Sequence, residues 1–375
     1  MKDSAFYVHI PFCDHKCIYC DFYSIITKEN IGNYLRAITK EIISYSRKFS
    51  LNRIYSSIYF GGGTPSLMEP EYLEKIVKCI KENYDVNDDA EITMETNPGT
   101  VNKDKLKKFR ELGINRISIG VQSFNNNELK FLTRIHNKEL AVSTIKDAAE
   151  AGFENISIDL IFNLPGQTKE KWLSNLEMAL QLPVKHISAY SLILERGTIL
   201  NKMVLDGKVN IQDSDYDADL YYLTMDFFQQ HGFIQYEVSN FALPGYECIH
   251  NKAYWHYRDY LSVGTSSHSF MNARRWWNYS SLKKFLTEIE KKGTAEANFE
   301  DLTFEQMLNE YIMLGLRCDG INICSLKEKF GSSWLDEKME KLESFEKEGF
   351  IVLNSNIRLT KKGYALCDKI IENIL

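Results

Sequence analysis

The sequence predicts an α/β protein: a partial (β/α)6 barrel of the TIM type, followed by a smaller, helical C-terminal module of winged-helix type. Three observations lead to this prediction. Strand-like and helix-like segments alternate through the first half of the chain, which is typical of parallel strands joined by crossover helices. Glycine-rich or polar motifs follow several of these strands, at the rim where such barrels build their sites. From about residue 301 the pattern becomes mainly helical.

Six segments have the length and composition of strands, and helical patterns separate them. The predicted strands are Phe6–Ile10, Ile54–Phe60, Glu91–Glu95, Arg116–Val121, Ile156–Ile161 and His186–Ser191. The predicted helices between them are Tyr34–Lys48, Glu71–Asn83, Lys103–Leu112, Lys138–Ala151 and Lys169–Leu182. Six units fall short of the eight that close a TIM barrel, so an open barrel is favoured.

The second half of the chain lacks the regular alternation of strand and helix patterns found in the first half. Asp215–Gln230 has the pattern of a helix and Phe233–Phe241 that of a strand. The C-terminal part combines helices with a strand–turn–strand, as winged helices do. It holds more acidic than basic residues, which argues against DNA binding and favours packing on the barrel. We therefore expect three parts: a barrel core at 1–205, a barrel extension at 206–300 and the C-terminal module at 301–375.

Bulk properties narrow the class of protein. The net charge of −6 argues against a nucleic-acid surface. No apolar run of about 18 residues is present, so we expect no membrane span and at most peripheral contact. The first strand begins near Ala5, which leaves no room for a signal peptide. The cysteines outside one N-terminal group are scattered, as expected of reduced thiols in the cytoplasm.

Cys13, Cys17 and Cys20 form a C-x₃-C-x₂-C run directly after the first predicted strand. Three thiolates on one short loop can hold three corners of a [4Fe–4S] cluster. Position 22 is Phe and no fourth cysteine follows nearby, so one iron would stay open to bind a small molecule. The alternatives are a zinc site, which would require four ligands, or three unrelated buried cysteines.

The stretch YVHIPFCDHKCIYCDF resembles the coproporphyrinogen-dehydrogenase and haem-chaperone (HemN/HemW) branch of the radical S-adenosylmethionine (SAM) superfamily. The resemblance covers essentially the whole chain. It continues through YFGGGTPS at 59–66, ETNP at 95–98, GVQSF at 120–124, DLIFNLPGQT at 159–168 and YSLILERGT at 190–198. It implies a cluster held by the three cysteines, with the amino and carboxylate groups of SAM on the open iron.

The resemblance also implies which residues contact SAM. The glycine run would bring backbone groups close to the SAM amino group, since glycine has no Cβ in the way. An arginine could pair the SAM carboxylate as a planar fork, and carboxylates or amides could accept amine and hydroxyl hydrogens. The residues carried over are Tyr7, Tyr19, Gly62, Gly63, Thr64, Glu95, Gln122, Arg134, Asp159 and Ile193. The alternatives are a tight turn without a ligand at the glycines, solvated surface charges at Glu95 and Arg134, and plain core positions for Tyr7 and Ile193.

A second motif, H-N-x-x-Y-W at 250–255, resembles the one that separates haem chaperones from true oxidases in this family. Imidazole is a common axial ligand of haem iron, and aromatic rings could flank a porphyrin. His250 is therefore the expected haem ligand, with Cys248 as a second candidate. An isolated histidine is more often structural. His256 and His268 carry no comparable argument, and His9 is expected to be a buried, hydrogen-bonded imidazole.

The sequence thus predicts a haem chaperone that binds haem and passes it to an apo-haemoprotein, with the SAM machinery regulatory or vestigial and no catalytic residue. A flavodoxin- or ferredoxin-type reductant is a candidate partner. The alternative is oxygen-independent oxidation of coproporphyrinogen III, and a less favoured one is radical SAM methylation. Two departures from the oxidases favour the chaperone: Phe22 stands where they carry a further cysteine, and their N-terminal extension is missing.

Overall fold

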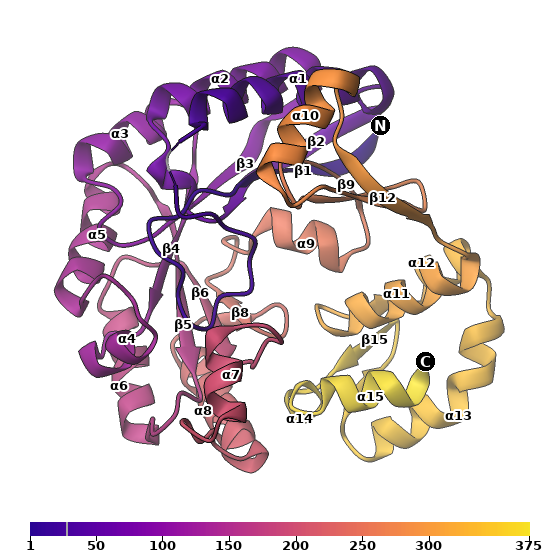
Figure 1. Ribbon diagram of the computed structural model, residues 1–375. Helices are drawn as coiled ribbons and strands as arrows, with labels where there is room; N and C mark the ends of the chain where they lie inside the picture. Colours follow the sequence, from indigo (N-terminus) through magenta and orange to yellow (C-terminus); the bar gives the residue numbers. More distant parts are fainter. Residues whose placement is uncertain (28) are drawn as a thin grey trace.

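The computed structural model describes residues 1–27 and 29–375 and shows a curved sheet wrapped on its outside by helices (Figure 1). In the described residues the main sheet is 12-stranded, in the order β12-β11-β10-β9-β1-β2-β3-β4-β5-β6-β8-β7. Its centre consists of parallel neighbours in chain order. These are β1 (Lys2–Ile10), β2 (Arg53–Gly62), β3 (Val86–Thr96), β4 (Arg116–Gln122), β5 (Asn155–Phe162) and β6 (His186–Ser191).

Helices cross over between these strands, so the predicted partial (β/α)6 barrel is confirmed. The crossover helices are α1 (Ile31–Phe49), α2 (Pro70–Asn83), α3 (Lys103–Glu111), α5 (Lys138–Glu150) and α6 (Lys169–Leu180). Short additional helices lie in the loops: η1 (Pro65–Leu67), α4 (Asn126–Phe131) and α7 (Ile199–Leu205). Buried aliphatic and aromatic side chains of strands and helices form one continuous core between the two layers.

Residues 206–300 add strands to both edges of the barrel sheet. On one side β9 (Asp259–Val263) runs parallel to β1, followed by β10 (His268–Met271), β11 (Arg274–Asn278), helix α10 (Leu282–Lys292) and β12 (Glu296–Asp301). On the other side, after α8 (Ser214–Gln230), lie β7 (Ile234–Gln235) and β8 (Asn240–Ala242), and β8 pairs with β6.

The predicted single strand Phe233–Phe241 is wrong, because this segment folds back as the β7–β8 hairpin. The Glu237 side chain accepts a hydrogen bond from the Ser239 N–H at 3.2 Å and so holds the turn. Side chain-to-backbone bonds of this kind compete with a regular strand.

The C-terminal module has its own hydrophobic core and a three-stranded antiparallel sheet. Its elements are α11 (Phe304–Leu316), β13 (Ile321–Asn322), α12 (Ile323–Phe330), α13 (Ser333–Lys347), β14 (Ile351–Leu353), β15 (Asn356–Leu359), α14 (Lys361–Tyr364) and α15 (Cys367–Ile374). It packs on the barrel extension: the Val238 N–H donates to the Arg317 carbonyl at 2.9 Å, and the Cys318 thiol donates to the Tyr236 carbonyl at 3.1 Å. The described helices include none that is long and apolar enough to cross a membrane.

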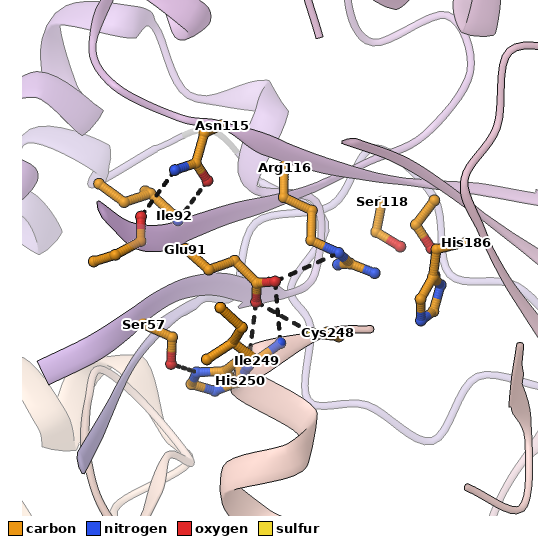
Figure 2. A network of polar contacts seen from close by, with 12 residues as sticks. Ser57, Glu91, Ile92, Asn115, Arg116, Ser118, His186, Cys248, Ile249 and His250 are labelled. Carbon is orange, nitrogen blue, oxygen red and sulfur yellow. Dashed lines mark hydrogen bonds and ion pairs between the residues drawn. The ribbon is translucent and has the colours of Figure 1, made fainter. Parts of the chain in front are cut away.

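Helix α9 (Ile249–Trp255) lies on the concave side of the curved sheet, against β1, β2 and β9 (Figure 1). Its N-cap residue, Cys248, makes no side-chain cap bond. The cap comes instead from Glu91 on β3, whose carboxylate accepts the Ile249 N–H at 3.1 Å, the His250 N–H at 3.2 Å and the Cys248 thiol at 3.3 Å (Figure 2). A carboxylate at a helix N-terminus is favourable because it meets unpaired N–H groups and the positive end of the helix dipole.

Glu91 and Arg116 form an ion pair inside the barrel. The Arg116 Nε atom lies 3.9 Å from the Glu91 carboxylate, and the two side chains are only 2% and 5% exposed (Figure 2). Removing one partner of a buried pair leaves the other charge uncompensated. The helix that carries the H-N-x-x-Y-W motif is therefore fixed to the barrel by a buried charge network.

We expect Glu91→Ala to lower the free energy of unfolding by about 3–5 kcal/mol, because it leaves the Arg116 charge unpaired and the start of α9 uncapped. Denaturant unfolding measures this change. The matched control is Glu82→Ala, which removes an exposed carboxylate 3.9 Å from Lys78 and should change stability by less than about 1 kcal/mol. Equal effects of the two substitutions would contradict the proposed role of Glu91.

Candidate functional site

The three motif cysteines lie on one loop that leaves the end of β1. The loop is closed at its base, where the Ile25 N–H donates to the Pro11 carbonyl at 2.8 Å and the Cys13 N–H donates to the Ile25 carbonyl at 3.0 Å. All three cysteines are free and partly exposed.

Three free cysteines on one loop suit a cluster better than zinc. A structural zinc site takes four protein ligands, whereas a [4Fe–4S] cluster can be held by three thiolates with one iron left open. The alternative of three unrelated buried cysteines is also not supported, because the sulfur atoms of two of them lie close to other site residues across the barrel mouth. Cys13 Sγ lies 3.4 Å from Thr64 Oγ1, and Cys17 Sγ lies 3.5 Å from a guanidinium nitrogen of Arg134.

The glycine run at the end of β2 lies directly against the cluster loop. The Gly63 N–H donates to the Ile10 carbonyl and the Thr64 N–H to the Phe12 carbonyl, both at 2.8 Å. A Cβ on Gly63 would lie 2.6 Å from the Phe12 oxygen, and one on Gly62, where φ is +114°, would lie 2.6 Å from the His9 ring. The glycines are therefore needed for the close approach of two loops, in addition to any contact with a ligand.

Arg134 is not a solvated surface charge. One terminal nitrogen donates to Asn97 Oδ1 at 2.5 Å and to the Gly120 carbonyl at 2.7 Å, which aims the guanidinium at Cys17. Its Nε is buried and makes no hydrogen bond to the described residues. A Cβ on Gly120 would lie 2.8 Å from Asn97 Oδ1, so only glycine leaves room for this arrangement. A carboxylate ligand would satisfy the free donor.

Glu95 lies next to the last residue of β3 and Asp159 lies in the middle of β5, and both face into the barrel. The Glu95 carboxylate accepts the Tyr59 hydroxyl at 2.8 Å and the Gly62 N–H at 3.1 Å, while Asp159 accepts the Ser118 hydroxyl at 3.3 Å. Burial raises the pKa of Glu95 to about 7, and the nearby Asp159 charge adds to the shift. Burial likewise raises the pKa of Asp159.

The remaining predicted cofactor contacts differ in their surroundings. Gln122 ends β4 with φ of +68° and is buried. This strained backbone turns its side chain toward Gly120. Tyr19 packs on a small apolar cluster and interacts with Arg134. Ile193 lies just beyond β6 and is 66% exposed, so it is not the plain core residue that the alternative interpretation predicted. Tyr7 is partly buried, and its hydroxyl is bonded to His9 Nδ1 at 3.2 Å.

His250 lies inside the barrel and is 1% exposed. Both of its ring nitrogens are hydrogen-bonded, Nδ1 to the Ser57 hydroxyl and Nε2 to the Tyr254 hydroxyl, each at 2.9 Å (Figure 2 shows the first). Burial, with the Arg116 charge, lowers the pKa of His250 to about 3. The ring therefore has no free nitrogen for iron in this structure. Burial also raises the pKa of Cys248 to about 12, so it stays a protonated thiol.

The H-N-x-x-Y-W helix connects to the barrel mouth through stacked rings. The His250 ring stacks on Tyr59 with centroids 4.8 Å apart, and the Tyr59 hydroxyl donates to Glu95. On its other side His250 bonds to Tyr254, whose ring meets Tyr260 edge-on at 4.6 Å. One histidine thus joins the mouth to a second feature, a cleft walled by Tyr254 and Tyr260.

This cleft lies between the cluster loop and the strands β9 and β10. Its volume is about 380 Å³, within the usual range of small-molecule sites. Phe22, two residues beyond the last motif cysteine, lies in its wall and is 65% exposed. The lining residues are Tyr7, His9, Asp21, Phe22, Tyr23, Tyr254, Tyr260, Ser266, Ser267 and His268.

Comparison with known proteins agrees with this geometry. Residues 7–179 match the Radical SAM superfamily and residues 302–366 match the HemN C-terminal domain. The solved structure of coproporphyrinogen III oxidase (HemN) from Escherichia coli, described as a radical SAM enzyme, is similar with a TM-score of 0.85 and 25% identity, covering 100% of this chain and 90% of that one. Fold and site therefore define a radical SAM protein.

Curated relatives identify the family within this superfamily. The protein called heme chaperone HemW of Lactococcus lactis is 34% identical over 100% of this chain and 98% of its own length. The protein of the same name from Bacillus subtilis is 34% identical over 97% of each chain. A mitochondrial radical SAM domain-containing protein 1 from Danio rerio is 32% identical over 100% of this chain and 87% of its length. The chain belongs to the HemW family of the radical SAM superfamily.

Membership of the superfamily implies a [4Fe–4S] cluster and SAM, and the residues present fit both groups. Three cysteines on one loop supply thiolates for three irons. The free Nε donor of Arg134 and the half-buried acceptors of Glu95 and Asp159 suit the carboxylate and the hydroxyl or amine groups of SAM.

Sequence reasoning missed residues that support the predicted ones. Asn97 accepts from Arg134 and donates to Thr64 Oγ1 at 2.9 Å, so it joins the arginine to the glycine turn. Asn97 lies within the E-T-N-P motif, and this position could have identified it from the sequence. Tyr59 and Tyr254, which hold His250, lie in quoted motifs as well. His268 had no sequence signal, because its importance depends on the cleft alone.

Binding of SAM should tighten as the pH rises from about 6 to about 8. With its pKa near 7, Glu95 carries a proton at low pH and loses hydrogen-bond acceptor strength, so each pH unit below the pKa weakens binding by up to about tenfold. Calorimetric titration at several pH values measures this slope.

Glu95→Gln should flatten the pH profile of SAM affinity, because an amide does not titrate. The control Glu82→Gln, an exposed carboxylate on α2, should keep the wild-type slope. Since the pKa of Asp159 is also raised, an unchanged slope in Glu95→Gln would assign the pH dependence to Asp159 instead.

Proposed function

We propose that this protein is a cytoplasmic haem chaperone that binds haem and delivers it to an apo-haemoprotein. The observation that carries the proposal is the aromatic cleft beside the cluster loop, where Phe22, Tyr23 and Tyr254 offer flat apolar surface to a porphyrin. The chain is similar over its full length to proteins named heme chaperones, which supports the same ligand.

In this proposal Cys13, Cys17 and Cys20 hold the cluster and leave one iron for SAM. Arg134 pairs the SAM carboxylate, and the carboxylates of Glu95 and Asp159 accept its hydroxyl or amine hydrogens. The other contacts proposed for SAM are Tyr7, Tyr19, Gly62, Gly63, Thr64, Gln122 and Ile193. When bound, the cluster supplies one-electron chemistry, for which a flavodoxin- or ferredoxin-type protein is the proposed reductant.

The second candidate function is oxygen-independent oxidation of coproporphyrinogen III, which the similarity to the Escherichia coli oxidase favours. Radical decarboxylation needs a substrate that is shielded from water. The cleft in this chain is open, and its wall beside the cluster loop is the exposed Phe22 rather than the cysteine that the oxidases carry there. We therefore favour the chaperone over the enzyme.

Reconstituted wild-type protein should bind haem and should not convert coproporphyrinogen III when incubated anaerobically with SAM and reductant. Haem binding is followed by absorption spectroscopy and conversion by chromatography of the tetrapyrroles. Cys17→Ala should lose the cluster absorption, since two thiolates do not hold a cubane stably, while Cys79→Ala, a buried cysteine on α2, should keep it.

Catalytic formation of protoporphyrinogen by the wild-type protein would overturn the chaperone proposal in favour of the oxidase. Iron-free protein with bound zinc after anaerobic purification would overturn the cluster assignment instead.

A further inference from the structure

We propose that haem binds in the cleft between the cluster loop and strands β9 and β10, with the imidazole of His268 as an axial ligand of the iron. This inference rests on the proposed haem chaperone function. It replaces His250, the ligand expected from sequence, with a residue 18 positions further along the chain.

The hydrogen bonds of the histidines carry the assignment. The chain has 8 histidines, and an axial ligand needs a neutral ring with a nitrogen free to meet iron. Of the two histidines that line the cleft, His9 uses both ring nitrogens, Nδ1 with the Tyr7 hydroxyl at 3.2 Å and Nε2 with the Tyr23 carbonyl at 3.0 Å. His268 makes no such bond to any described part of the chain, and it is the exposed first residue of β10.

The surroundings of His268 suit iron ligation. The ring stacks on Trp277 of β11, with centroids 5.7 Å apart and planes 23° apart, so its orientation is fixed by packing rather than by a hydrogen bond. Partial burial of the ring, with the Arg275 charge, lowers the pKa of His268 below its ordinary value. A lowered pKa favours the neutral imidazole, the form that binds a metal.

The other lining residues suit a porphyrin. Five aromatic rings face the cleft: Tyr7, Phe22, Tyr23, Tyr254 and Tyr260. Aromatic rings contact a flat apolar ligand through large, rigid surfaces. Asp21 is a carboxylate in the lining, so we place the anionic propionates toward the open side of the cleft, away from it.

The arrangement gives the H-N-x-x-Y-W motif a positioning role. His250 Nε2 is bonded to the Tyr254 hydroxyl at 2.9 Å, and the Tyr254 ring meets Tyr260 at 4.6 Å. Both tyrosines form cleft wall, so the buried histidine sets the shape of the site without touching the iron. The opposite wall, Asp21 to Tyr23, directly follows Cys20, which places bound haem next to the cluster.

The test is a haem titration of the full-length, cluster-reconstituted protein, read by absorption and by electron paramagnetic resonance of the ferric haem. His268→Ala should weaken haem binding by about tenfold to a hundredfold and remove the signature of histidine ligation, and added imidazole should restore that signature. His231→Ala is the matched control, an exposed histidine bonded to the Phe227 carbonyl, and should behave as wild type.

The variant His250→Ala tests whether His250 is a ligand of the iron or only positions the cleft wall. Because it releases Tyr254 and removes the contacts to Ser57 and Tyr59 but leaves His268 in place, it should weaken binding while keeping the histidine signature. The proposal is overturned if His268→Ala keeps that signature and His250→Ala or Cys248→Ala loses it, while the chaperone function then stands. If the wild-type protein binds no haem, the proposed function itself fails. His268→Gln is a second variant, because the glutamine side chain fills roughly the volume of the imidazole ring and so keeps the cleft from collapsing. It should lose the signature of histidine ligation, as His268→Ala does.

Discussion

The carboxylate of Glu91 is the contact on which the arrangement of the site depends. It caps the start of α9 and pairs with Arg116 inside the barrel, so a helix from the second half of the chain is fixed within a barrel built by the first half. From α9, His250 reaches Tyr59 and thereby Glu95 at the mouth, and it also reaches Tyr254 in the cleft. One buried charge network thus positions the proposed SAM site and the proposed haem site together.

Much of the fold followed from the sequence because it is encoded locally. Alternating strand and helix patterns located the six parallel strands to within a few residues, and motifs at their ends marked the barrel mouth. The Phe233–Phe241 segment was not predictable in the same way, because a single buried side chain, Glu237, bends an otherwise strand-like run. The free nitrogens of His268 and the occupied ones of His250 depend on tertiary contacts, such as that with Ser57, which is 193 residues away.

Two features of the site bear on the proposed choice between a chaperone and an oxidase. At the barrel mouth Asn97 holds Arg134 against Cys17 of the cluster loop, which suits the proposed SAM site of either kind of protein. The cleft beside them is open and aromatic, and Phe22 lies in its wall. An open cleft suits a ligand that is taken up and passed on intact. Its shared border with the cluster loop offers a physical route by which loss of the cluster would disturb the haem site.

A crystal structure of the anaerobically reconstituted protein with haem, with iron atoms located by anomalous scattering, tests this account most directly. We predict haem iron bonded to the His268 ring in the cleft, and α9 still capped by Glu91 with His250 bonded to Ser57. Haem iron bonded to His250, with α9 withdrawn from the barrel, would contradict the account.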